Sequence, residues 1–430
     1  MKILYVSQYF PPEKCAPAAR VSELAQRWSK NGHDITVLTG FPNHPTGILH
    51  PDYRKRFRRL LNREQSGDVH VVRTWLWPLP NANIWKRVIC YLSFFLSACV
   101  AGLFCRRPDV LIATSPQLLV GVSGWFLAHW FEVPFVLEIR DLWPESLGAV
   151  GARGCRTQLY RAVGWLAGFL YKRADQIVVV TPAFHHELVT RWDVPARKIS
   201  VVENGIEPEL FSPTGPGHVR SAFALEGKFV VSYIGTLGMA HGLETVLRAA
   251  ELLRTRCPAA HILLMGDGAE RSAIEKEAAT RSLHNVSLLP SQPHEDIPAF
   301  VRASDICLVT LKKADAFRSV IPSKMLEFMA CGRAVVLSVE GQAAEILQQA
   351  NAGVSIEPEA PEQLADAILS LYRQSDLRGR MGANGRAYVR QRFTRERTAA
   401  KYIVVLQSVL KDAETRRFPQ PAQVPRATRM

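Results

Sequence analysis

The segment whose residue types most clearly suggest ligand binding or catalysis begins at Arg318 and contains a predicted helix. Ser323 follows a proline, as at many helix starts, and Lys324 and Glu327, three residues apart, share one helix face. The helix N-terminus and Lys324 could hold a phosphate, while Glu327, one turn deeper, could accept two hydrogen bonds from a sugar diol. The alternative is a surface ion pair on an amphipathic helix. The pattern favours a site for a ligand that carries both a phosphate and a sugar.

Two glycine-rich turns precede this segment. The turn 235–242 contains Gly235, Gly238 and His241, and the next predicted strand ends at Gly266-Asp267-Gly268. Small residues at a strand end let backbone N–H groups approach an anion, so the first turn is a second candidate for phosphate binding. The turn at Gly266 and Gly268 is as compatible with a plain connection as with a binding loop.

Charged residues also gather after the predicted strand Phe135–Ile139. Five residues at the end of this strand and in the following loop have side chains that could bind a ligand or act in catalysis: Glu138, Arg140, Asp141, Trp143 and Glu145. Charges at the end of a buried strand must be hydrated, paired or used. We therefore predict a functional loop, in which Arg140 and Asp141 act in catalysis and Trp143 and Glu145 bind a substrate. The alternative is a structural Arg140–Asp141 pair.

The first predicted strand leads into a loop that ends at a helix start. This loop, residues 8–20, contains Glu13, a candidate substrate ligand, and small residues such as Ala16 at the start of a helix. It has no G-x-G-x-x-G pattern, so we do not expect a dinucleotide site. Residues 1–10 hold only four apolar residues in a row and are expected to form a strand rather than a signal peptide.

Short β-rich runs alternate with helical segments along the whole chain, which predicts an α/β fold. Continuous Val/Ile/Leu runs of this kind are typical of doubly wound parallel sheets with helices on both faces. Because such sheets bind ligands at the carboxyl ends of their strands, the loops described above are the expected sites. The runs are 3–6, 34–39, 69–74, 110–114, 135–139 and 176–181, then 229–234, 262–265, 286–289, 306–311 and 334–339.

This pattern predicts two Rossmann-like domains that face each other across a cleft. The first domain covers residues 1–205 and the second 206–393, with a hinge at the Asn-Gly step 204–205. A last helix, about 394–411, is expected to pack back on the first domain. Residues 412–430 hold three prolines and few packing side chains, so a disordered tail is predicted.

The composition is that of a folded protein with an anionic partner. The 430 residues are 47% hydrophobic and carry 53 Lys and Arg against 39 Asp and Glu, a formal charge of +14. Residues 1–205 hold 25 of these basic residues against 15 acidic ones, so the excess lies mainly in the first half. Eight cysteines without C-x-x-C or zinc-type spacing indicate reduced thiols in a cytoplasmic protein, and no metal site is expected.

The uncharged segment Val88–Phe104 is flanked by basic residues and resembles a membrane element. At ~1.5 Å per residue its length is just short of the ~30 Å hydrocarbon core, and a span would separate strands of one sheet. We therefore weigh an in-plane helix at the bilayer surface, with Phe94, Phe95 and Leu96 as apolar contacts, against an ordinary core helix. The basic run Arg54–Arg63 favours the first, although it could be a solvated helix face.

Taken in order, these motifs resemble the retaining GT-B glycosyltransferases of family 4 over residues 1 to about 410. Within that family the chain is most similar to enzymes of bacterial surface polysaccharides, of the colanic-acid and O-antigen type, which resemble fucosamine transferases. The motifs that carry the resemblance are Tyr9-Phe10-Pro11-Pro12-Glu13, the linker 203–207, the turns 235–242 and 266–268, Pro322-Ser323-Lys324 and Glu327-Phe328-Met329-Ala330.

The resemblance implies a nucleotide-sugar donor held by the second domain and a lipid-linked saccharide acceptor held by the first. Glu327 matches the second glutamate of the family's E-x7-E motif, which binds the ribose, whereas Ser319 stands where the first is expected. Thr236 and His241 replace the usual arginine and lysine of the glycine turn, and Arg140 replaces a histidine. The diphosphate is then left to Lys324, Arg318, the helix start and the amides near Gly238 and Ala16.

This reading implies a retaining hexosyltransferase that needs no metal or other cofactor. It would act on the cytoplasmic face of the inner membrane, where the basic first domain meets anionic lipid. A UDP-sugar, such as an N-acetylated amino sugar, is the favoured donor, but the base, the sugar, the acceptor hydroxyl and the oligomeric state are left open. The alternatives are a nucleotide-sugar 2-epimerase on the same fold and, more remotely, a nucleic-acid-binding scaffold, for which no recognition motif is present.

Overall fold

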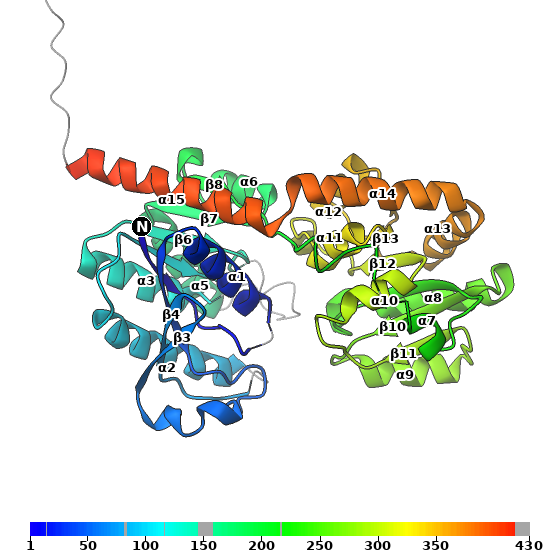
Figure 1. The fold of residues 1–430 in the computed structure, drawn as a ribbon, viewed down its shortest axis with the longest axis horizontal. Helices are drawn as coiled ribbons and strands as arrows, with labels where there is room; N and C mark the ends of the chain where they lie inside the picture. The colour runs from blue at the N-terminus through cyan, green and yellow to red at the C-terminus, as the bar shows by residue number, and fades with distance from the viewer. Residues whose placement is uncertain (14, 81–83, 116, 145–157, 216, 418–430) are drawn as a thin grey trace, which may run out of the picture.

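The computed structural model describes the chain except for residues 14, 81–83, 116, 145–157, 216 and 418–430. It consists of two α/β domains that lie side by side (Figure 1). Each domain has its own sheet and its own hydrophobic core on both faces of that sheet. The predicted fold class, two doubly wound domains, is confirmed.

The first domain contains an eight-stranded sheet in the order β3-β4-β2-β1-β5-β6-β7-β8. All neighbours pair in parallel except β3, which is antiparallel to β4. The connections change direction between β1 and β5, so the crevice beyond the carboxyl ends of these strands is the expected ligand position. The strands are β1 (Lys2–Val6), β2 (Asp34–Gly40), β3 (Leu61–Ser66), β4 (Val69–Thr74), β5 (Val110–Thr114), β6 (Phe135–Ile139), β7 (Gln176–Val179) and β8 (Ile199–Val201).

Helices cover both faces of this sheet. Alternate residues of β1 enter opposite cores, with Ile3 on one face and Leu4 on the other. The face that contains Ile3 is covered by α1 (Ala16–Lys30) and α15 (Arg395–Arg417). The other face is covered by α2 (Ile84–Leu103), α3 (Leu118–Phe131), α5 (Gln158–Arg173) and α6 (Pro182–Thr190).

The second domain contains a six-stranded parallel sheet in the order β11-β10-β9-β12-β13-β14. Its connections change direction between β9 and β12, so the loops after these strands are the expected binding loops. Its strands are β9 (Phe229–Ile234), β10 (Ala260–Met265), β11 (Val286–Leu289), β12 (Ile306–Thr310), β13 (Ala334–Ser338) and β14 (Gly353–Ser355). Its helices are α7 (Val219–Ala222), α8 (Leu243–Arg256), α9 (Arg271–Thr280), α10 (Ile297–Ala303), α11 (Ser323–Ala330), α12 (Gln342–Gln349), α13 (Pro361–Arg373) and α14 (Ser375–Arg392).

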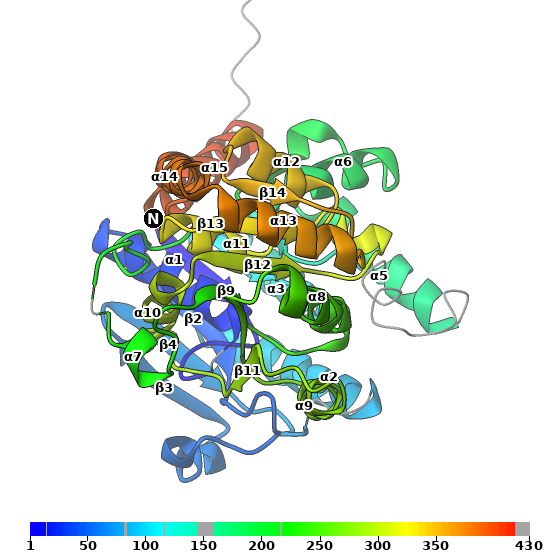
Figure 2. The ribbon, with the colours of Figure 1, turned by 90° about the vertical axis from the view of Figure 1, so that its right-hand side faces the viewer.

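The chain crosses between the domains twice, and the two crossings are hydrogen-bonded to each other. The Ile206 amide donates to the Phe393 carbonyl (2.8 Å), and the Arg395 amide donates to the Ile206 carbonyl (3.0 Å). A Cβ on Gly205 would lie 2.6 Å from the Arg395 nitrogen, so only glycine permits this close approach. After the second crossing α15 lies along the first domain, where the Trp28 indole donates to the Ala399 carbonyl (3.1 Å) (Figures 1 and 2).

Three local predictions are wrong. Residues 412–417 are not a disordered tail, because the Lys-Asp-Ala-Glu-Thr-Arg-Arg sequence from Lys411 favours helix and α15 continues to Arg417. Residues 418–430 lie outside the described chain. The basic run Arg54–Arg63 is not a helix: it forms short 3-10 turns and then enters β3. Strands β3, β8 and β14 were not predicted, since β3 is polar and the other two have three residues each.

Candidate active site

Lys324 is held at the start of α11, beside the first strand of the second domain. Its Nζ donates to the hydroxyl of Tyr233 (2.9 Å) and lies 4.1 Å from the centre of the Tyr233 ring. The Tyr233 hydroxyl in turn donates to the Thr236 carbonyl in the turn after β9 (2.7 Å). Tyr233 therefore positions the lysine at the crevice between β9 and β12. One signal for this role was visible in the sequence, a tyrosine next to the end of an aliphatic strand.

The charges around Lys324 are close to their titration points. Burial lowers the pKa of Lys324 to about 8, although Glu327 opposes this effect. Burial raises the pKa of Glu327 to about 7, against the opposite effects of Arg395 and Lys324. Both side chains are only partly exposed. Near neutral pH the pair can carry one positive and one negative charge, as a diphosphate and a sugar diol require.

His241, in the turn after β9, has its ring centre 5.9 Å from that of Tyr233 and is neutral at pH 7. Burial, followed by the nearby charge of Lys324, lowers the pKa of His241 to about 4. Its Nδ1 lies 3.4 Å from the Thr310 carbonyl, while the Thr310 hydroxyl donates to the His241 carbonyl (2.7 Å). A neutral imidazole offers a hydrogen bond but no positive charge, so Lys324 is the cation of this crevice.

The predicted glycines hold the two turns together rather than all facing a ligand. A Cβ on Gly266 would lie 1.8 Å from the Gly235 carbonyl oxygen, and one on Gly268 would lie 2.2 Å from the Leu237 carbonyl oxygen. Gly235 has φ +144°, and its Cβ would lie 2.7 Å from the Lys324 Nζ. Gly235 thus leaves room for the lysine, whereas Gly266 and Gly268 permit the close packing of the β9 and β10 turns.

The remaining predicted donor residues surround this crevice less directly. Ser323 is exposed at the first position of α11, and Gly238 begins the short 3-10 turn Met239–His241. Arg318 is exposed and within ion-pair distance of Asp315 (3.9 Å) and Glu340 (3.7 Å). A role of Arg318 on a diphosphate would require an exchange of these partners, and it stays a prediction.

In the first domain, Glu13 joins two strand-end loops. Its carboxylate is buried and accepts hydrogen bonds from the amides of Asn43 and His44 (both 3.0 Å) and, more weakly, from that of Phe10 (3.4 Å). Burial raises its pKa to about 7, and these amides act in the opposite direction. Glu13 therefore shapes the crevice, and direct acceptor binding by Glu13 stays a prediction. The Asn43–His44 loop, where His44 lies against the Tyr9 ring, was not recognised in the sequence.

The loop after β6 begins at a buried ion pair. Glu138, inside the strand, accepts hydrogen bonds from Arg20 Nε (2.9 Å) and the Tyr5 hydroxyl (2.6 Å). Arg140 and Asp141 follow, and within the described residues no ion pair joins them, so the structural-pair alternative is not formed. Trp143 is half-buried beside them.

The two remaining predicted residues are Ala16 and Glu145. Ala16 is the first residue of α1 and is exposed. Glu145 lies outside the described residues.

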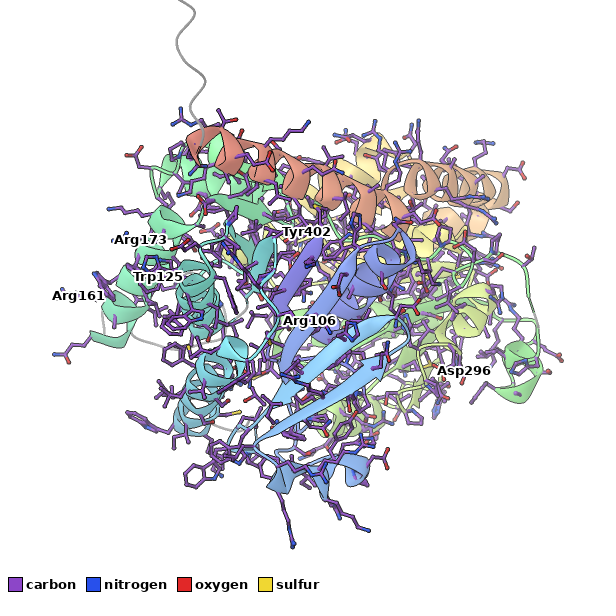
Figure 3. All side chains as sticks on the ribbon, turned by 60° about the vertical axis from the view of Figure 1, so that its left-hand side comes forward. Arg106, Trp125, Arg161, Arg173, Asp296 and Tyr402 are labelled. Atoms are coloured by element: carbon purple, nitrogen blue, oxygen red, sulfur yellow. The ribbon has the colours of Figure 1, made fainter. Side chains whose placement is uncertain are left out.

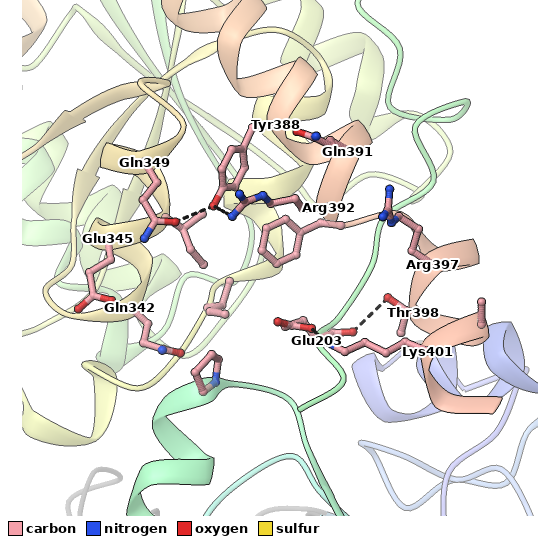
Figure 4. A pocket seen from close by; sticks show the side chains of 15 residues that line it. Glu203, Gln342, Glu345, Gln349, Tyr388, Gln391, Arg392, Arg397, Thr398 and Lys401 are labelled. Carbon is pink, nitrogen blue, oxygen red and sulfur yellow. Dashed lines mark hydrogen bonds and ion pairs between the residues drawn. The ribbon is translucent and has the colours of Figure 1, made fainter. Parts of the chain in front are cut away.

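An interdomain cavity of about 690 Å³ lies behind the hinge, between α12, α14 and α15 (Figure 4). Some of its polar groups pair with one another: the Tyr388 hydroxyl donates to Gln349 Oε1 (2.9 Å), and Lys401 pairs with Glu203 (3.0 Å), whereas Gln342 Oε1 is buried without a partner. None of the predicted site residues lines it. The strand-end crevices, rather than this cavity, therefore carry the candidate chemistry.

An ionic network links the donor helix to the hinge. Arg395, at the second crossing, pairs with Glu23 of α1 (2.7 Å) and with Glu207 of the linker (2.9 Å). Glu207 also pairs with Arg27 of α1 (2.8 Å), and Arg395 is the charge that most lowers the pKa of Glu327. This network was missed in the sequence because its members are up to 372 positions apart.

Helix α2 has two apolar faces, one packed on the sheet and one exposed. The core-helix interpretation of Val88–Phe104 describes the first face, and the exposed apolar residues of the surface-helix interpretation lie on the second. Phe94 is fully buried in the sheet core, with Cys90 and Ala98 one turn away on either side. On the other side exposed apolar side chains recur every three or four residues, and we call these the outer stripe: Trp85, Ile89, Leu92, Leu96 and Val100. The prediction that Phe94 is a surface contact is wrong, because this side chain packs under the sheet.

The outer stripe belongs to a larger surface formed by α2, α3 and α5. Trp130 of α3 and Trp165 of α5 are 61% and 72% exposed. Figure 3 shows Arg161 and Arg173 of α5 at the outer edge of this layer. Exposed basic residues also lie at both ends of α2 and in the 3-10 turns before β3: Arg54, Lys55, Arg58, Arg59, Lys86, Arg87, Arg106 and Arg107.

Within the described part of the chain, no group of three His, Cys, Asp or Glu side chains could hold a metal ion. Metal independence itself stays a prediction.

The two pKa values predict a pH optimum for donor binding. Below about 7 Glu327 gains a proton and can no longer accept two hydrogen bonds, and above about 8 Lys324 loses its charge. The affinity for a nucleoside diphosphate should therefore be highest between these values and fall on both sides. Calorimetric titration of UDP at a series of pH values checks this, with Glu327→Gln as the control that should remove the acidic limb only.

Gly235→Ala should displace Lys324 and weaken donor binding. The added Cβ would lie 2.7 Å from Nζ at a φ of +144°, a conformation that costs a non-glycine residue of order 1–3 kcal/mol. Thermal melting and UDP titration measure the two effects. Gly217→Ala is the matched control, because no atom lies within 4 Å of its added Cβ. Equal UDP affinity in both variants would show that Lys324 does not contact the ligand.

Two domain families match this chain. Residues 16–205 match the glycosyl transferase 4-like domain, and residues 219–388 match the glycosyl transferases group 1 family. With two doubly wound domains and a lysine-glutamate pair at a strand-end crevice, the chain is a GT-B glycosyltransferase in class. More particularly, it combines a glycosyl transferase 4-like domain with a group 1 domain.

Relatives and solved structures agree with this assignment. WcaI of Escherichia coli (strain K12), a glycosyl transferase named for colanic acid biosynthesis, is 26% identical over 420 residues, which cover 94% of this chain and 99% of WcaI. Sucrose-phosphate synthase from Thermosynechococcus elongatus superimposes with a TM-score of 0.75 at 19% identity, over 96% and 99% of the two chains. Anabaena Alr3699/HepE in complex with UDP superimposes with a TM-score of 0.71 at 17% identity, over 95% of this chain and 100% of HepE.

Proposed function

We propose that this protein transfers a sugar, with retention of configuration, from a nucleoside-diphosphate donor to a saccharide of a bacterial surface polysaccharide. The observation that carries the proposal is the Lys324–Glu327 pair, positioned by Tyr233 at the crevice between β9 and β12. Support for the product class comes from the similarity to WcaI over nearly the whole chain. UDP is the favoured nucleotide, since the similar HepE structure holds it.

The proposed role of the second domain is to hold the donor and stabilise its leaving group. Lys324 and the free amides at the start of α11 would bind the diphosphate, and Glu327 would accept hydrogen bonds from the ribose hydroxyls. These groups are already in place, so charge that develops on the diphosphate meets a preorganised cation. Because Thr236 and His241 carry no positive charge at neutral pH, we propose that Lys324 stabilises the diphosphate with less help than in relatives with the full motif.

The proposed reaction places the acceptor hydroxyl on the face from which the diphosphate leaves. The acceptor would lie at the first-domain crevice, where Asp141 can accept a hydrogen bond from that hydroxyl and Trp143 offers a ring for a sugar to stack on. The departing phosphate takes the proton of the hydroxyl while the new glycosidic bond forms. The protein then acts mainly by orientation and electrostatics, without a metal ion or a covalent intermediate.

The acceptor is proposed to be lipid-linked, with the enzyme bound to the cytoplasmic face of the inner membrane. The outer stripe exposes apolar side chains that would enter the headgroup region, and basic residues at both ends of α2 would contact anionic lipid. α2 reaches the acceptor crevice directly, since Gln8 Nε2 in the loop after β1 contacts Cys90 Sγ (3.4 Å). Docking of α2 would thus bring that crevice to the bilayer surface.

Thermal shift against a panel of nucleoside diphosphates tests the donor class. A ligand at 100 times its Kd adds about 2.7 kcal/mol to the free energy of unfolding. UDP should raise the melting temperature more than GDP or ADP, with or without EDTA. No shift with any nucleoside diphosphate would contradict the proposal, and a shift that EDTA abolishes would contradict metal independence.

A further inference from the structure

The buried carboxylate two residues before Arg140 already has a hydrogen-bond partner at each oxygen. Glu138 is completely buried, and its two oxygens accept from Arg20 Nε (2.9 Å) and from the Tyr5 hydroxyl (2.6 Å). The other two guanidinium nitrogens of Arg20 donate to Asn204 Oδ1 (2.8 Å) and to the Val202 carbonyl (3.0 Å). This local network is therefore complete without Arg140.

Arg140 adds a second guanidinium to this single buried carboxylate. Its backbone amide donates to Ser115 Oγ at the end of β5 (2.9 Å), which fixes the residue beside the crevice. Its Nε and Nη1 are inaccessible to solvent and have no hydrogen-bond partner. Asp141, the next residue, is exposed and forms no ion pair with it among the described residues. Two buried N–H donors of Arg140 are thus left without a partner, and its charge shares the carboxylate of Glu138 with Arg20.

Such an arrangement is costly unless a ligand completes it. A buried charge without a partner of its own destabilises a protein, and each unpaired donor adds to this cost. Burial and the neighbouring Arg20 lower the pKa of Arg140, while Glu138, Tyr5 and Asp141 raise it. A neutral sugar hydroxyl could accept one hydrogen bond but would leave the charge uncompensated. An anion with two oxygens would satisfy both.

We propose that Arg140 binds a compact anion carried by a substrate, either a sugar carboxylate or a phosphate group, at the first-domain crevice. The guanidinium fork matches either group. The inference uses the proposed function only to say that a sugar substrate brings the anion. It makes Arg140 a specificity residue that favours charged substrates over neutral ones.

Ligand-observed NMR titration of the intact protein tests this directly. The probes are sodium glucuronate, inorganic phosphate and, as the neutral control, glucose. Wild-type protein should bind at least one anion and not glucose, and the preferred anion distinguishes a sugar carboxylate from a phosphate. Arg140→Gln should weaken that binding tenfold or more, Arg140→Lys less so, and Asp141→Asn should strengthen it by removing a repulsive charge. Equal affinities in wild type and Arg140→Gln would overturn the proposal.

Melting temperature provides a second readout that a structural role would move in the opposite direction. If Arg140 serves to bind a ligand rather than to stabilise the fold, Arg140→Gln removes a buried charge that has no partner of its own. The variant should then melt at the same or a higher temperature than wild type. A clear drop would show that Arg140 stabilises the fold and would overturn the inference. Because no probe contains a nucleotide, these outcomes are independent of whether UDP binds, which tests the proposed function separately.

Discussion

Lys324→Ala should lower kcat/KM for sugar transfer by about two to three orders of magnitude while the protein remains folded. Removal of one preorganised donor to a developing negative charge typically costs ~3–4 kcal/mol, and His241 of the turn after β9 is neutral and cannot replace the lost charge. Stability should change little or increase, because Lys324 is partly buried and unfavourably desolvated. Initial rates with the donor below saturation measure the effect.

Lys313→Ala is the matched control for this variant. Lys313 is another lysine of the same domain, but its side chain is 63% exposed and its Nζ lies 3.9 Å from Glu340 Oε1. It should retain wild-type activity. A Lys324→Ala variant with kcat/KM near that of Lys313→Ala would show that the pair at the start of α11 is structural.

Replacing the outer stripe by serine should release the protein from anionic membranes without unfolding it. The variant is Ile89, Leu92, Leu96 and Val100→Ser, whose side chains are 43–62% exposed. Full burial of four such side chains is worth about 6 kcal/mol, so even half of this predicts a hundredfold drop in partitioning. Sedimentation with anionic liposomes, at low and high salt, measures the apolar and electrostatic contributions.

Two controls separate binding from folding. Val404→Ser alters an equally exposed apolar residue on α15 and should leave liposome binding unchanged. Phe94→Ser should instead lower stability by about 3–5 kcal/mol, because Phe94 is fully buried. The membrane proposal fails if wild-type protein does not sediment with liposomes at low salt, or if the stripe variant binds as wild type does.

The sequence was most informative where local pattern and tertiary environment agree. Buried parallel strands such as Phe229–Ile234 are continuous apolar runs, so both sheets could be predicted. Strand β3 could not, because it is an edge strand with the polar sequence Leu-Asn-Arg-Glu-Gln-Ser. α2 could be recognised as apolar, but a helix that is apolar all round has no periodicity to show that Phe94 faces the core and Leu96 faces outward.

The candidate site was predicted in part for a similar reason. Lys324 and Glu327 are neighbours on one helix turn, so their proximity follows from spacing alone. Tyr233, which positions Lys324, is 91 residues away, and Arg20, which neutralises Glu138, is 118 residues away. Such contacts depend on which strands are adjacent in the sheet. The same long-range pairing decides that Arg140, rather than Arg20, is left with unpartnered donors.

Real-time NMR of the anomeric centre during transfer from a UDP-sugar to a lipid-linked saccharide tests the central claim most directly. The account predicts UDP release coupled to a new glycosidic bond with the same anomeric configuration as the donor, in wild-type protein and not in Lys324→Ala. A product of inverted configuration, or a donor sugar epimerised at C2 without transfer to the acceptor, would contradict it.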